Sequence, residues 1–142
     1  ETRRLLILQA AAFLPLFRDA MKGRGKVGDA RIDTFEPAEK PTDPDAVFAE
    51  LSKDKAAAAQ SALALLKADP AAGEKLIDAG RLLIFFKGTD AHDYKFSSAV
   101  MEDFGNVSPG WRDRFLAASL FWLKGSGGPD APVVKRIHAA LA

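Results

Sequence analysis

The chain of 142 residues contains no cysteine. Disulfide bonds, thiolate nucleophiles, cysteine-ligated zinc, iron–sulfur clusters and covalently attached c-type haem are therefore excluded. Histidine, with two residues, and tyrosine, with one, are also scarce. The missing cysteine leaves the compartment open, because oxidising and reducing compartments both hold cysteine-free proteins.

The chain also lacks an excess of charge of one sign, because it contains 20 Lys and Arg and 19 Asp and Glu. A net charge of +1 gives no electrostatic footprint for nucleic acid or for an anionic membrane. The longest apolar run, residues 5–17, is well short of the ~20 residues that span a bilayer. We therefore expect no nucleic-acid partner and no membrane span.

The residues that are present predict helices. Hydrophobic residues make up 48% of the chain and charged residues 27%, which is typical of a globular protein. Asp43-Pro44, Asp69-Pro70 and Ser108-Pro109 each place an N-cap residue before a proline at the first helical position. Gly88, Gly105 and Gly125 follow apolar runs, where glycine commonly ends a helix in the left-handed conformation. With the helical spacing of the apolar residues, these signals predict helices over residues 3–21, 44–51, 53–68, 70–87, 91–104, 109–124 and 131–141.

No sustained alternation of β-branched residues occurs, so no sheet is expected. The short connections predict an all-α fold, either an antiparallel helical bundle or stacked αα-hairpins. We interpret residues 1–21 as an N-terminal apolar helix, 22–41 as a linker with several glycines and charges, and 42–142 as a helical domain. Together they are expected to form a single compact unit.

The segment 5–17 is apolar over most of the circumference of its helix, with Pro15 as a predicted kink. Such a helix is either the centre of a bundle or covered by a partner. Because the chain starts with Glu1 rather than Met, the partner is expected to be another protein chain or a missing upstream segment of this one. A homo-oligomer is a further alternative.

Thr2-Arg3-Arg4 followed by this apolar run resembles a twin-arginine export signal. No A-x-A cleavage site follows Phe17, because Arg18 and Asp19 come next. A cytoplasmic location is therefore favoured, with twin-arginine export as the alternative.

The stretch from Gly88 to Lys95 is the densest in chemical groups. Asp90, His92 and Asp93 are the candidate metal ligands or proton-transfer groups, with Tyr94 beside them. Glu102 or Asp103, farther along the same helix, are candidates to join them. In the alternative interpretation, Asp90 is an N-cap and Asp93 complements the positive end of the helix dipole.

The remaining motifs give weaker indications of function. Residues 23–28 read G-x-G-x-x-G, but the strand that a dinucleotide-binding loop requires does not precede them. A basic loop able to hold a phosphate near Arg24 and Lys26 is the most that they predict. His138, near the end of the last helix, is expected to interact with the helix dipole. Ser97, Ser98 and Ser119 lie inside predicted helices and outside any nucleophile motif, and the glycines of 125–128 predict either a hinge or a close backbone approach.

No catalytic constellation and no cofactor motif stands out, so no cofactor is expected, and whether the chain is an enzyme is left open. The favoured function is a non-catalytic helical interaction or accessory module, such as a subunit, an adaptor or an oligomerisation domain. The alternative is a small-molecule or metal-binding helical protein, in one variant an enzyme, with its site around Asp90–Tyr94.

Overall fold

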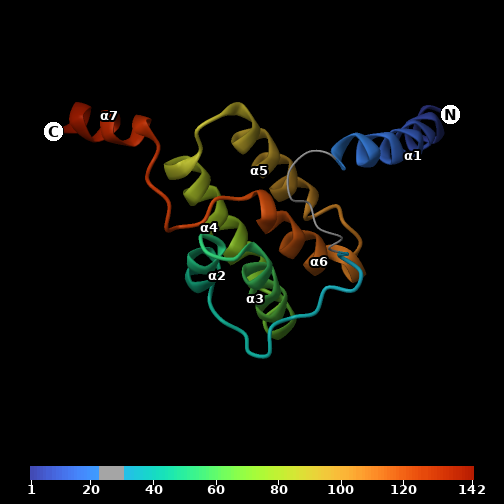
Figure 1. The fold of residues 1–142 in the computed structure, drawn as a ribbon, viewed down its shortest axis with the longest axis horizontal. Helices are drawn as coiled ribbons and strands as arrows, with labels where there is room; N and C mark the ends of the chain where they lie inside the picture. Colours follow the sequence, from blue (N-terminus) through green and yellow to red (C-terminus); the bar gives the residue numbers. More distant parts are fainter. Residues whose placement is uncertain (23–30) are drawn as a thin grey trace. The chain divides into compact units, whose positions relative to one another are not determined.

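The computed structural model describes residues 1–22 and 31–142, so the G-x-G-x-x-G motif at 23–28 lies outside the described residues. The described residues form seven α-helices and one short 3₁₀ helix, without a strand, and helices pack against one another (Figure 1). The predicted all-α class is confirmed. The chain divides into two units, residues 1–31 and residues 32–142, and each is described by itself.

The described part of the first unit contains one helix, α1 (Thr2–Met21), with Pro15 inside it. None of the 20 residues of α1 is buried. Both interpretations of α1, as the centre of a bundle and as a helix covered by a partner, stay predictions.

The second unit contains the other helices. They are α2 (Pro44–Leu51), α3 (Lys55–Ala68), α4 (Ala72–Lys87), α5 (Ala91–Asp103), α6 (Pro109–Ser119), η1 (Leu120–Trp122) and α7 (Pro132–Leu141). α3 packs against α2, α4, α6 and η1, and α5 packs against α4.

Aspartates cap three of these helices. The carboxylate of Asp43 accepts a hydrogen bond from the amide of Ala46 at 2.8 Å. Asp54 accepts two, from Ala56 at 2.8 Å and Ala57 at 3.0 Å, and Asp90 caps α5. Each of these carboxylates satisfies backbone N–H groups that a helix start leaves without intrahelical partners.

The side-chain caps predicted at Asp69 and Ser108 are wrong. Asp69 accepts a hydrogen bond from the Ala71 amide in the turn before α4, and the Ser108 side chain makes no cap hydrogen bond to α6.

Several predicted helix ends differ from the structure. None of Gly88, Gly105 and Gly125 is left-handed, so the predicted glycine caps are wrong, and Gly88 is extended with φ −68° and ψ 134°. Glycine is needed there for another reason, because an added Cβ would lie 2.6 Å from the Ile84 carbonyl oxygen and 3.1 Å from the ring of Tyr94. The helix predicted over 109–124 ends at Ser119 and continues as the 3₁₀ helix η1. Residues three apart align in a 3₁₀ turn, so Leu120 and Leu123 both reach the core.

The core of the second unit is built around α3. Ala58, Ala59 and Ala62 are completely buried and Leu63 is as well. Small side chains on one helix let its neighbours approach closely, and the larger Phe48, Leu76 and Leu120 fill the space beside them. This packing makes α3 the element that the other helices share.

The second half of the predicted linker is attached to this core. The guanidinium of Arg114 on α6 donates to the carbonyls of Ile32 at 2.8 Å and Phe35 at 2.6 Å. The amide of Ala38 donates to the carbonyl of Gln60 on α3 at 3.0 Å. The side chain of Phe35 packs against the core, so residues 32–38 form part of the second unit.

The glycine-rich turn at 125–128 makes a close backbone approach to the end of α2. The amide of Gly127 donates to the Ser52 hydroxyl at 2.8 Å, and the amide of Ser126 donates to the Phe48 carbonyl at 2.9 Å. A Cβ added at Gly125 would lie 2.7 Å from the Ser52 nitrogen, whereas one at Gly128 would meet nothing within 4 Å. Of the two alternatives, the close approach is what the structure contains, and it is made to the chain's own α2.

Gly125→Ala is expected to lower the free energy of unfolding by about 1–3 kcal/mol, the usual cost of forcing an extra carbon into a packed contact. Gly128→Ala is the matched control, because the space around it is open. Urea unfolding of both variants measures the difference. Equal stabilities for the two would show that the turn does not need the close approach at position 125.

Candidate functional site

The start of α5 places Asp90 as its N-cap. The Asp90 carboxylate accepts hydrogen bonds from the amides of His92 at 2.7 Å and Asp93 at 3.2 Å. Its backbone is extended, as an N-cap requires. One carboxylate oxygen of Asp90 therefore accepts both hydrogen bonds from the first turn of α5.

His92 points into solvent. Its side chain is 95% exposed, and its Nδ1 lies 3.6 Å from an Asp90 carboxylate oxygen. That distance is beyond an ordinary hydrogen bond. An imidazole in this setting has no enclosing pocket that would orient it toward a substrate.

Asp93 is the most enclosed of the three, with 12% of its side chain exposed. It accepts a hydrogen bond from the Thr89 amide at 2.9 Å and forms an ion pair with Lys124 at 2.9 Å. Burial alone would raise the pKa of the Asp93 carboxyl, but the Thr89 amide and the Lys124 ammonium together outweigh it and lower that pKa. The pair joins the start of α5 to the chain just beyond η1.

Tyr94 and two serines have structural contacts. The Tyr94 hydroxyl donates to the carbonyl of Gly88 at 3.1 Å. The hydroxyls of Ser97 and Ser119 donate to carbonyls three residues earlier, at 3.0 and 2.6 Å. Ser97 and Ser119 thus bond back to the preceding turn of their helices, as serines inside helices often do.

Within the described ranges, no three His, Asp or Glu side chains lie close enough to share a metal ion. Glu102 is ten residues from His92 along α5, which is about 15 Å at the helical rise. Metal binding at Asp90, His92 and Asp93 stays a prediction, and the contacts observed at these residues are those of a capped helix start.

His138 is exposed on α7. The residue that sequence reasoning missed is Lys124, because no local pattern links it to Asp93.

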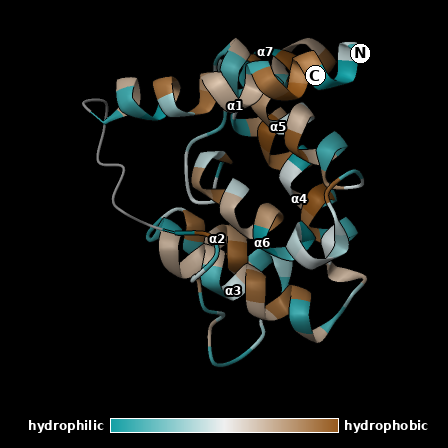
Figure 2. Ribbon diagram, turned by 90° about the vertical axis from the view of Figure 1, so that its right-hand side faces the viewer, coloured by the Kyte–Doolittle hydropathy of each residue, from teal (hydrophilic) through white to brown (hydrophobic). Residues whose placement is uncertain are grey.

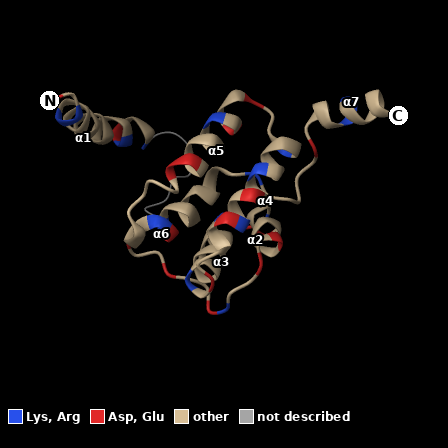
Figure 3. Cartoon of the chain, turned by 180° about the vertical axis from the view of Figure 1, so that it is seen from behind, with Lys and Arg blue, Asp and Glu red and all other residues tan. Residues whose placement is uncertain are grey.

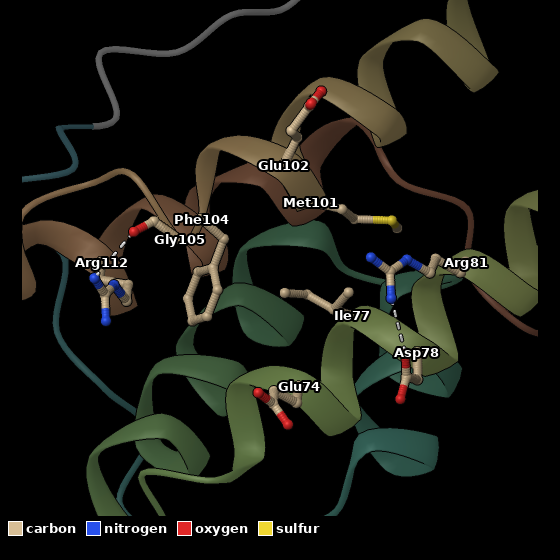
Figure 4. A pocket seen from close by; sticks show the side chains of 9 residues that line it. All are labelled: Glu74, Ile77, Asp78, Arg81, Met101, Glu102, Phe104, Gly105 and Arg112. Atoms are coloured by element: carbon tan, nitrogen blue, oxygen red, sulfur yellow. Dashed lines mark hydrogen bonds and ion pairs between the residues drawn. The ribbon is translucent and has the colours of Figure 1, made fainter.

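A shallow hollow of about 550 Å³ lies between α4, α5 and α6 (Figure 4). Its lining residues are Glu74, Ile77, Asp78, Arg81, Met101, Glu102, Phe104, Gly105 and Arg112.

Both guanidiniums of the hollow already have partners. Arg81 pairs with Asp78 at 3.0 Å. Arg112 donates to the carbonyls of Gly105 at 3.3 Å and Val107 at 3.2 Å, and its guanidinium lies 5.7 Å from the centre of the Phe104 ring. The Nε of Arg112 is buried without a hydrogen-bond partner, so it is closed to a ligand in the hollow. The arrangement points to packing between helices rather than to ligand recognition.

Exposed apolar side chains are the clearer candidate for a functional surface. On α1, eight large apolar residues are between 50% and 71% exposed: Leu5, Leu6, Ile7, Leu8, Phe13, Leu14, Leu16 and Phe17. Figure 2 shows the apolar colouring along this helix. We call these eight residues the α1 apolar surface.

The second unit also exposes apolar side chains. Leu82 and Phe85 lie on α4, with Phe85 74% exposed, and Trp122 lies on η1. On α7, Val133, Ile137 and Leu141 follow one another at intervals of four and form one stripe along the helix. Contiguous exposed apolar surface on a folded protein typically marks an interaction site.

No family model, curated protein or solved structure matches this chain. In the part of the chain that is described, no helix combines the length and hydropathy needed to cross a membrane.

Asp90→Ala is expected to lower the free energy of unfolding by about 0.5–2 kcal/mol, because two amides lose their acceptor. His92→Ala, as the control in the same turn, should change it by no more than about 0.5 kcal/mol, since the imidazole is exposed. Denaturant unfolding of both variants measures this. A stable Asp90→Ala protein that loses bound metal or ligand would instead favour the metal-site hypothesis.

The lowered pKa of Asp93 predicts a pH dependence of stability. Its contribution is present above the ordinary carboxyl pKa of 3.8 and is lost as the pH falls toward the lower folded-state pKa. From about pH 5 to about pH 2, the free energy of unfolding should therefore fall more steeply for the natural chain than for Asp93→Asn. Parallel curves in urea titrations would contradict the ion pair with Lys124.

Proposed function

We propose that this chain is a non-catalytic helical interaction or accessory module that binds another protein chain through residues 5–17. The observation that supports it best is the α1 apolar surface, since α1 buries none of its residues. Eight large apolar side chains at one helix exceed what a free surface helix ordinarily carries.

The energetics favour a covered state of α1. Burying one large aliphatic or aromatic side chain contributes about 1.5–3 kcal/mol relative to leaving it in water. Phe13 and Phe17 stack with ring centroids 5.6 Å apart and remain at least half exposed. A partner that covers several of these side chains can therefore offset the entropy lost on association.

The exposed apolar residues of α4, η1 and α7 support the same class of function. They belong to the second unit, whose core is complete without covering them. A protein that presents apolar side chains on several helices, with no assembled catalytic groups among its described residues, fits a subunit or adaptor better than an enzyme.

The partner of α1 has two further candidates, a second copy of this chain and an upstream segment of it. The small-molecule or metal-binding alternative at Asp90–Tyr94 has less support, because Asp90 caps α5, Asp93 pairs with Lys124 and His92 faces solvent. Metal analysis of the purified protein separates that alternative from an interaction module.

Removing residues 1–21 is expected to leave the melting temperature of the second unit unchanged and to abolish self-association. The reason is that an uncovered apolar helix associates with any apolar surface available, including its own copies in a purified sample. Light scattering over a range of concentrations and thermal unfolding measure the two effects.

A double variant, Phe13→Glu with Phe17→Glu, should reduce self-association in the full chain. Gln9→Glu is the matched control, because it adds a negative charge one turn away without removing an apolar side chain. A full-length chain that stays monomeric at all concentrations, or a second unit that unfolds without residues 1–21, would count against the proposal.

A further inference from the structure

We propose that α1 is also a twin-arginine export signal, read through Arg3 and Arg4, which directs the folded second unit across a membrane. This inference goes beyond the interaction module and does not depend on it. It rests on the arginine pair, on the exposure of α1 and on the independence of the second unit's core.

The order of residues in α1 fits a targeting segment. Thr2, Arg3 and Arg4 stand at its start, the apolar run 5–17 follows, and Arg18 ends the run. Figure 3 shows basic residues at the start of α1 and near its end, with none between them. A basic start followed by 7–15 apolar residues is the pattern of an export signal, and the paired arginines are specific to the twin-arginine route.

The exposure of α1 meets a requirement that is particular to this route. Twin-arginine export carries proteins that have already folded, so its signal must stay accessible after the rest of the chain has packed. Arg3 and Arg4 are exposed, and no residue of α1 is buried. A helix that contributed to the core would be withdrawn from the export machinery by folding itself.

The second unit is a suitable cargo. Every buried hydrophobic residue among those described lies between Val47 and Val134, so this core can close without α1. The chain has no cysteine, and its folding before export therefore needs no oxidising compartment. The proposal gives α1 the role of an address that a receptor reads.

The experiment follows the full chain, with an initiating Met before Glu1, in a bacterium that has the twin-arginine route. The test variant is Arg3→Lys with Arg4→Lys, which keeps the charge but removes the planar guanidinium forks that a receptor can bind bidentately. Arg18→Lys is the matched control, because it makes the same change in the same helix outside the pair. Cell fractionation gives the exported share, and circular dichroism checks that each variant is folded.

The natural chain and Arg18→Lys are expected to appear outside the cytoplasm. The double variant should stay inside, folded, at the level found for the natural chain in a strain that lacks the route. Retention of the natural chain in the cytoplasm would overturn the proposal. Export of the double variant, or export in the strain without the route, would overturn it equally and assign α1 to general secretion. Neither result bears on self-association, which is measured on purified protein and depends on apolar side chains.

Discussion

The close packing of α3 against its neighbours is the contact on which the second unit depends. Its buried alanines allow α2, α4, α6 and η1 to approach one helix, and Leu63 fills the centre among them. A larger side chain at Ala58, Ala59 or Ala62 would push several helices apart at once, since interiors of this density have little room to adjust. The polar ties at the surface, such as Arg114 to the Ile32 and Phe35 carbonyls, hold loops onto a core that α3 has already organised.

The polar groups of this protein are used mainly to begin helices and to join elements. Asp90 caps α5, Asp93 pairs with Lys124, and Lys87 binds the Gly128 carbonyl and the Asp130 carboxylate before α7. Carboxylates and a histidine gathered at a helix start look like a catalytic cluster in a linear sequence. The distances show that each aspartate has a local structural partner, and the histidine has no enclosing surroundings.

α1 differs from the other helices because none of its residues is buried. The two proposals for it share the apolar run 5–17, which contacts a partner in one and forms the apolar part of the signal in the other, and only the export proposal also uses the arginine pair. They are compatible, because no A-x-A site follows Phe17 and an exported chain would keep the helix. The exposed stripe on α7 and the exposed face of α4 add further apolar surface to the second unit.

The sequence by itself determined the helical class and most helix starts within two residues. The reason is that caps and helical periodicity depend on residues within one turn of each other, as at Asp43 and Asp90. It could not determine the end of α6, where packing of Leu120 and Leu123 favours a 3₁₀ turn, or the pairing of Asp93 with Lys124. It also left open whether the glycines at 125–128 form a hinge. Those outcomes depend on which surfaces meet across distant parts of the chain, and only the tertiary structure brings Ser52 to Gly127.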